Sequence, residues 1–297
     1  MIKKPTNVLM GYIMLLPALV LFVGFIVYPL IYGFIISLNK WDGFGPMKFV
    51  GFRNYIGVFQ DNLFYTSFSH NIIYMFVSVI VKIVLSICLA LLLNRKIHGL
   101  TFYRTAYFMP VIISFIAIGM MFQFILDPNV GFISPLLVKV GVTKEPILFL
   151  GDPKLALFSI IAVDCWKWTG YQTVIFLAGL QTIPGELYES CDIDGASAWQ
   201  KFWGITLPLL KPVTIINLTL TLMGSFSVFD LVFVMTNGSG GPLNSTHVLL
   251  TYMYKITFGS SNSNLGYGSV VAYIVLAIII VISVFQDQLT HEKKGNE

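Results

Sequence analysis

Long runs of hydrophobic residues alternate with short polar segments along the whole chain. A transmembrane helix needs about 20 mostly apolar residues, and six runs are long enough. These runs are residues 8–38, 71–93, 105–126, 155–180, 213–235 and 268–289. The pattern therefore predicts an all-α polytopic membrane protein with six transmembrane helices.

The first of these runs is unusually long and contains Pro17 and Pro29, which can kink it or mark where its helix begins and ends. It is too long for a cleaved signal peptide, and no small-residue cleavage site closes it, so we expect an uncleaved first helix. None of the connections between the runs is long enough for a separate fold. We therefore expect residues 1–297 to form a single integral membrane domain.

Composition narrows the function classes. Of 297 residues, 56% are hydrophobic and 11% are charged, with a mean hydropathy of +0.81. A soluble domain carries roughly a quarter charged residues, so a soluble enzyme is excluded. The net charge of +4 provides no broad basic face, so we expect membrane lipid around the chain and no nucleic acid partner.

Lysine and arginine are distributed unevenly between the two sides of the predicted helices. They are denser in the N-terminal segment, residues 94–104, residues 184–212 and the C-terminal tail than in the other connections. Because positive residues collect on the cytoplasmic side, both termini are predicted to be cytoplasmic.

The motifs of common membrane and soluble enzymes are missing from the sequence. The four histidines are scattered, and no His-Glu-x-x-His, Gly-x-Ser-x-Gly or nucleotide-binding P-loop sequence occurs. The sequence therefore predicts no enzyme, with no catalytic residues, no metal ligands and no cofactor bound by this chain.

The connection at residues 184–212 predicts two short helices. Pro184 followed by acidic residues is a helix-start signal, and Gly195 ends that helix or bends the chain. A second helix can begin after Ser197 or Asp194, either of which can cap it. The residues support two interpretations equally: a hairpin that docks into a partner's groove, or an amphipathic hairpin lying on the bilayer.

This connection resembles the EAA loop of binding-protein-dependent ABC importer permeases. The family pattern is Glu-Ala-Ala, three residues, Gly, nine residues and Ile-x-Leu-Pro. The chain has Glu189-Ser190-Cys191, Gly195 and Ile205-Thr206-Leu207-Pro208 at that spacing, with two small residues in place of the alanines. The surrounding Ile-Pro-x-Glu-Leu-Tyr-Glu and Ile-Asp-Gly-Ala-Ser phrases resemble the carbohydrate-uptake branch, the maltose and glycerol-phosphate type.

Two further phrases extend the resemblance over nearly the whole chain. One is Phe49-Val50-Gly51-Phe52-Arg53-Asn54-Tyr55 after the first run. The other is the segment from Thr236 to Pro242, which resembles the Thr-x-Gly-Gly-Pro phrase of sugar permeases but is longer.

The resemblance implies the fold of an ABC type I importer permease. It also implies that solute translocation and ATP hydrolysis are carried out by different subunits. ATP and Mg would be used by a separate P-loop ATPase, present in two copies, beside a second homologous six-span permease and an extracytoplasmic solute-binding protein. The location would be the cytoplasmic (inner) membrane of a bacterium or archaeon. The implied ATPase-coupling residues are Glu189, Asp194, Gly195, Ala196, Ser197 and Ala198.

Polar and aromatic residues inside the fourth and fifth predicted helices are candidates for the solute path. They are Asp164, Trp168, Tyr171, Phe226, Ser227, Phe229 and Asp230. Trp168 and Tyr171 are three residues apart on one helical face, as are Phe226 and Phe229, and aromatic platforms suit the apolar faces of sugars.

Structural alternatives exist for the charged residues. Asp164 can pair with Lys167 three residues later, and Lys82 can pair with an acid such as Asp230 or extend toward the interface. Since these two lysines are the only cations available in the path, a neutral sugar is favoured over an anionic solute. We therefore expect a permease for a carbohydrate, either an oligosaccharide or a glycoside. The alternative is an ion-coupled secondary transporter for a small polar solute, which Asp164 and Asp230 could serve.

Overall fold

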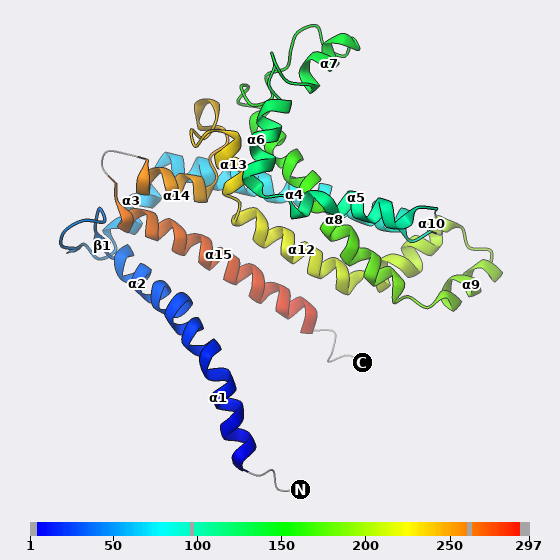
Figure 1. The fold of residues 1–297 in the computed structure, drawn as a ribbon, viewed down its shortest axis with the longest axis horizontal. Coiled ribbons are helices and arrows are strands. Elements are labelled where there is room, and N and C mark those ends of the chain that lie inside the picture. Colours follow the sequence, from blue (N-terminus) through cyan, green and yellow to red (C-terminus); the bar gives the residue numbers. More distant parts are fainter. Residues whose placement is uncertain (1–4, 96–97, 260–262, 292–297) are drawn as a thin grey trace. The chain divides into compact units, whose positions relative to one another are not determined.

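A computed structural model describes residues 5–95, 98–259 and 263–291 of the chain. These residues are mostly helical, in agreement with the sequence prediction (Figure 1). They form two compact units. The first contains residues up to Asn62 together with Met253–Ile274, and the second contains Leu63–Tyr252 together with the chain from Val275 onward.

In the first unit, the first hydrophobic run forms one unbroken helical stretch. It consists of α1 (Pro5–Phe22), a π-helical turn (Val23–Val27) and α2 (Tyr28–Ser37). Pro17 lies inside α1, and Pro29 lies in the first turn of α2, where a missing N–H is tolerated. Neither proline therefore ends the helix.

A short hairpin and helix complete this part of the first unit. Strands β1 (Asn39–Lys40) and β2 (Lys48–Phe49) pair antiparallel, with Asn39 opposite Phe49, and α3 (Arg53–Gln60) follows. The buried Asn54 side chain donates hydrogen bonds to the carbonyl oxygens of Ser37 (2.8 Å) and Asn39 (2.9 Å). These bonds hold α3 against the end of α2.

The second unit contains most of the remaining helices. They are α4 (Asn62–Leu93), α5 (Leu100–Ile112), α6 (Phe115–Ile125), α7 (Ile133–Lys139), α8 (Ala156–Gln181), α9 (Gly185–Ile193), α10 (Ala198–Lys201), a π-helical turn (Phe202–Thr206), α11 (Leu207–Leu209), α12 (Lys211–Phe226) and α13 (Asp230–Met235). A 3₁₀ turn (Pro242–Asn244) and helices α14 (Leu249–Phe258) and α15 (Leu265–His291) complete the chain, and the last two contribute residues to both units.

Helix α8 is the centre of the second unit, and residues on all of its faces are buried. It packs against α5, α12 and α13. The approach to α5 is very close at Gly170, where a Cβ atom would overlap the carbonyl oxygen of Tyr107. Along α8, the hairpin of α9 and α10 lies at one end, and α6, α7 and α13 lie toward the other (Figure 1).

Two of the predicted transmembrane helices are broken. The run 105–126 is divided between α5 and α6, whose axes differ by 99°, because Pro110 weakens the end of α5 and Ser114 caps a new helix by accepting a hydrogen bond from the Ala117 N–H. The run 213–235 is divided between α12 and α13 by non-helical backbone at Ser227 and Phe229. The prediction of one continuous helix is therefore wrong for both runs.

Within the described residues, three helices are long and apolar enough to cross a membrane, or up to five if each of two bent helix pairs counts as one span. The three are Met10–Ser37, Asn62–Leu93 and Leu265–Gln286. The bent pairs are Leu100–Ile112 with Phe115–Ile125, and Ala198–Leu209 with Lys211–Phe226, whose axes differ by 68°. The count of six spans stays a prediction. Residues 1–4 and 292–297, for which the sequence predicts a cytoplasmic position, lie outside the described residues.

Candidate functional site

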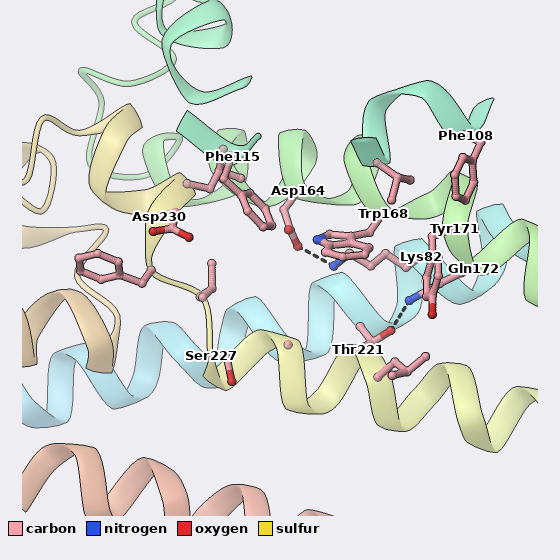
Figure 2. A pocket seen from close by; sticks show the side chains of 16 residues that line it. Lys82, Phe108, Phe115, Asp164, Trp168, Tyr171, Gln172, Thr221, Ser227 and Asp230 are labelled. Carbon is pink, nitrogen blue, oxygen red and sulfur yellow. Dashed lines mark hydrogen bonds and ion pairs between the residues drawn. The ribbon is translucent and has the colours of Figure 1, made fainter. Parts of the chain in front are cut away.

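A cavity of about 580 Å³ lies inside the second unit, beside the middle of α8 (Figure 2). Its size lies within the roughly 300–1,000 Å³ of typical small-molecule sites. Its walls come from α4, α5, α6, α8, α12 and the segment that leads into α13. The lining residues are Lys82, Phe108, Val111, Phe115, Asp164, Trp168, Tyr171, Gln172, Leu220, Thr221, Gly224 and residues 227–231.

The two helix breaks meet at this cavity. Val111 and Phe115 flank the break between α5 and α6, and residues 227–229 form the break between α12 and α13. Irregular backbone at membrane depth is tolerated where it is buried in protein or lines a polar cavity. The breaks therefore form part of the site and open the interior of the unit.

One wall of the cavity is aromatic. The rings of Trp168 and Tyr171 meet edge to face with their centroids 5.7 Å apart, and Phe115 lies 6.1 Å from Trp168 on the other side. Residues three apart on a helix face the same direction, which is why α8 presents both rings together. The predicted Trp168–Tyr171 face is therefore present.

A buried ion pair lies in the cavity wall. Nζ of Lys82 on α4 is 2.5 Å from Oδ2 of Asp164 on α8, and each side chain is 6% exposed (Figure 2). The expected pairing of Asp164 with Lys167 is wrong, as is the pairing of Lys82 with Asp230. The Lys167 ammonium instead binds backbone carbonyl groups at the end of α5. Asp164 therefore pairs with Lys82, which α4 places beside it.

Uncharged polar groups complete the lining. Nε2 of Gln172 donates to Oγ1 of Thr221 (2.6 Å), which joins α8 to α12. The Oε1 atom of Gln172 is buried and accepts no hydrogen bond from the described residues. A buried acceptor without a donor is costly, so Gln172 carries an unsatisfied polar atom beside the cavity. The sequence reasoning missed Gln172 and Thr221, although a Gln next to Tyr171 inside an apolar run was a usable signal.

Six of the seven residues predicted for the solute path line this cavity: Asp164, Trp168, Tyr171, Ser227, Phe229 and Asp230. Phe226 does not line it and is buried at the end of α12. The helix ends at Phe226, so Phe229 does not share a helical face with it and stacks on Phe233 instead. Contact of the six with a solute stays a prediction.

At the far end of α8, α9 and α10 form the expected two-helix hairpin. Pro184 precedes α9, and Gly195 follows it with φ +73°, a left-handed conformation that favours glycine. Of the two candidate caps, Ser197 caps α10: its hydroxyl accepts the Gln200 N–H, and the Gln200 side chain accepts the Ser197 N–H, which is a capping box.

The hairpin presents its coupling candidates outward. Glu189, Asp194, Gly195, Ser197 and Ala198 are exposed, and Ala196 is half-buried. An ion pair between Lys201 and Asp192 (2.5 Å) and a hydrogen bond from the Ala196 N–H to the Cys191 carbonyl oxygen (2.9 Å) fix the two helices against one another. The elbow is thus a preformed, solvent-facing surface of small and acidic residues.

The segment from Thr236 to Pro242 forms a tight turn after α13. Gly238, Gly240 and Gly241 have positive φ, and residues of this turn line a cavity of about 440 Å³ together with Asp127. The backbone N–H groups of Val130 and Asn129 donate to the Asp127 carboxylate and hold its pKa below its usual value. Asp127 therefore stays ionised at neutral pH.

Comparison with protein families and curated proteins gives a consistent result. The family model described as a binding-protein-dependent transport system inner membrane component matches residues 82–294. The lactose transport system permease protein LacF of Rhizobium radiobacter is 34% identical over 287 residues, which cover 96% of this chain and 95% of LacF. The trehalose/maltose transport system permease protein MalF of Thermococcus litoralis is 37% identical over 276 residues, which cover 92% of this chain and 90% of MalF.

The probable ABC transporter permease protein YurN of Bacillus subtilis is 35% identical over 283 residues, which cover 94% of this chain and 95% of YurN. Among solved structures, a chain in the crystal structure of a bacterial alginate ABC transporter, in complex with its alginate pentasaccharide-bound periplasmic protein, superposes with a TM-score of 0.83. Its sequence identity is 22%, and the match covers 98% of this chain and 96% of that one. This likeness establishes that the fold is that of an ABC importer subunit.

Proposed function

Because this chain belongs to the family of binding-protein-dependent transport system inner membrane components, we propose that it is the permease of an ATP-driven importer of neutral carbohydrates. The observation that carries the choice of substrate is the cavity beside α8. It combines an aromatic wall with hydrogen-bonding groups, and in the described part of the chain its one lining cation is already paired.

The chemistry of a sugar ring suits this cavity. A pyranose has apolar C–H faces and a rim of hydroxyl groups, so it binds to aromatic rings flanked by donors and acceptors. Trp168 and Tyr171 supply the rings, and Gln172, Ser227 and Asp230 supply polar atoms around them. The relatives named for lactose and for trehalose and maltose support the same class.

Charge argues for a neutral solute. The positive charge of Lys82 is neutralised by Asp164 at 2.5 Å, and Asp230 is exposed in the cavity without an ion-pair partner among the described residues. The cavity thus carries one uncompensated negative charge. An anionic solute would be repelled, whereas a neutral sugar can use the carboxylate as a hydrogen-bond acceptor.

The hairpin of α9 and α10 supplies the link to ATP hydrolysis in this proposal. Its acidic and small residues are exposed, and its Gly195 elbow is preformed, so it can seat in a groove of another subunit with little reorganisation. ATP and Mg would be bound there and not by this chain. Closure of the ATPase dimer would move the hairpin and, through α8, the walls of the cavity.

The complete importer would contain further subunits. We infer two copies of a P-loop ATPase, a second six-span permease and an extracytoplasmic solute-binding protein. The alginate transporter, solved with its periplasmic protein, supports the last of these. In this arrangement the chain crosses a bacterial or archaeal cytoplasmic membrane six times, with both termini cytoplasmic. The six spans are the three long helices, the two bent helix pairs and α8.

The ion-coupled alternative is less well supported. Of the two acids that suggested it, Asp164 and Asp230, the first is committed to Lys82, so one carboxylate without an ion-pair partner among the described residues remains in the cavity. The family assigned to the chain works with a binding protein, which a self-sufficient secondary transporter does not use.

Uptake into proteoliposomes tests the proposal. The assembled transporter is reconstituted with its binding protein, and accumulation of a radiolabelled neutral disaccharide retained by that protein is followed with and without internal ATP. We expect ATP-dependent accumulation that falls in Trp168→Ala and persists in Trp166→Ala, because Trp166 is the same residue type two positions away but lies outside the cavity. Accumulation driven by an ion gradient without ATP would overturn the proposal.

A further inference from the structure

Lys167 binds the backbone at a helix break. It lies on α8, is 2% exposed, and its ammonium donates to the carbonyl oxygens of Pro110 (3.0 Å), Val111 (3.1 Å) and Ile113 (2.6 Å). Pro110 and Val111 belong to the last turn of α5, whose carbonyl groups a helix end leaves without intrahelical partners, and Ile113 is the extended residue that follows the helix. One side chain therefore satisfies three acceptors at the point where the chain turns by 99° into α6.

The same ammonium lies against two aromatic rings. It is 4.7 Å from the centroid of Phe115, the first residue of α6, and 5.7 Å from that of Trp168. Both distances are within the range of cation–π attraction. Because both rings line the cavity, Lys167 connects the helix break to the aromatic wall.

Neighbouring residues on α8 favour this position of the Lys167 side chain. Asp164, one turn earlier on α8, is taken by Lys82, so it does not draw the ammonium away. Gly170, one turn later, allows α8 to approach the Tyr107 carbonyl so closely that Lys167 can reach the end of α5. Two of the three acceptors, the carbonyl oxygens of Pro110 and Val111, are fixed by the backbone of α5, which makes the contact rigid on that side.

We propose that Lys167 is a positioning residue for the solute site: it holds the angle between α5 and α6 and so keeps Phe115 and Trp168 together as one aromatic wall. The proposal rests on the proposed function, since it gives that cavity its shape. Lys167 itself is absent from the lining, so its effect on transport is exerted through the rings and the backbone it binds.

Spin labels measure the angle without any solute. The labels are placed at Phe102 on α5 and Phe124 on α6, which are both exposed, after the native cysteines Cys88, Cys165 and Cys191 are replaced by alanine. The assembled transporter is studied in lipid nanodiscs by double electron–electron resonance. With Lys167 present we expect one narrow distance distribution.

Three variants then distinguish the contributions of the charge, the length and the packing of the Lys167 side chain. Lys167→Met should broaden the distribution and move it to longer distances, because the freed carbonyls no longer hold the bend. Lys167→Gln should broaden it less, since it retains donors but loses the charge and part of the reach. Lys167→Arg should restore a narrow distribution. If Lys167→Met does not assemble, the same comparison is made with Lys167→Gln. The proposal would be overturned if Lys167→Met, or Lys167→Gln in its place, gave the same distance distribution as the wild type.

Transport kinetics provide the second readout. In proteoliposomes, Lys167→Gln should raise the apparent KM for the disaccharide about tenfold and change kcat less than twofold, and Lys167→Arg should recover most of the loss. A role in stability alone would leave KM unchanged, which would contradict the positioning role. Failure of the proposed function would show separately, as absent uptake in the wild type while the spin-label distances still respond to Lys167.

Discussion

Lys82 and Asp164 form an ion pair 2.5 Å long across α4 and α8, in the wall of the cavity where α8 also presents its aromatic rings. Neither charge has another partner of opposite sign among the described ion pairs, so each depends on the other. The pair therefore fixes α4 against α8 and also determines how much net charge a solute meets.

Breaking this pair should destabilise the transporter. Lys82→Met leaves a buried carboxylate and Asp164→Asn leaves a buried ammonium, and removing one partner of a buried pair costs about 3–5 kcal/mol. Each single variant should lower the thermal unfolding temperature of the assembled, detergent-solubilised transporter. The double variant Lys82→Met/Asp164→Asn should lose less than the sum of the two, since no charge is left unpaired. Additive losses would mean that the pair contributes nothing as a pair.

Asp230 should determine the charge preference of the cavity. Asp230→Lys changes the net charge of the lining from −1 to +1, and a unit charge at about 10 Å contributes about 1.7 kcal/mol at an effective dielectric constant of 20. We expect this variant to admit an anionic disaccharide such as a glucuronide at least about tenfold better than the wild type. Competition against uptake of the neutral disaccharide measures the effect. Asp230→Asn serves as the control of intermediate charge, and an order that does not follow charge would remove Asp230 from the solute path.

Gly195 should be required for coupling. Gly195→Pro cannot adopt the observed φ of +73° and also removes the N–H that donates to the Asp192 carbonyl oxygen (3.2 Å). The variant should remain in the membrane but lose the ATPase or its solute-stimulated hydrolysis. Gly185→Ala is a matched control, because a Cβ at either glycine meets no atom within 4 Å and only Gly195 has a positive φ. Normal docking and stimulation in Gly195→Pro would refute the coupling assignment.

The capping box at the start of α10 should contribute to the same surface. Ser197→Ala removes an N-cap, which costs about 1 kcal/mol of helix stability. We expect solute-stimulated ATP hydrolysis to fall about two- to fivefold. In the control Ser190→Ala, the lost hydroxyl donates only to the Glu186 carbonyl oxygen within α9, and activity should stay near that of the wild type. Equal effects of the two substitutions would show that the cap does not matter for coupling.

The hydrophobic pattern predicted the helical segments but not their interruptions. Hydropathy reports how apolar a run is, and the runs 105–126 and 213–235 remain apolar across their breaks. Pro110 and Ser114 were visible as break signals, whereas the stretch from Ser227 to Phe229 contains neither proline nor glycine. The assumption of one continuous helix is what misplaced Phe226.

Local chemistry was predicted more successfully than long-range pairing. The two hairpin helices, the Gly195 elbow and a Ser197 cap follow from residues within a few positions of one another. The Lys82–Asp164 pair joins residues 82 positions apart, and Lys167 reaches residues more than 50 positions earlier. Such partners depend on how the helices pack, which one sequence does not specify. They are also the contacts that give the cavity its charge and shape.

The most direct test of the central claim is affinity purification of the tagged chain from its native membranes, with mass spectrometry of the proteins that copurify. We predict a P-loop ATPase and a second six-span permease in stoichiometric amounts with the wild type and with Gly185→Ala, and loss of the ATPase with Gly195→Pro. A chain that is recovered alone, or only with copies of itself, would contradict its assignment as one subunit of an ATP-driven importer.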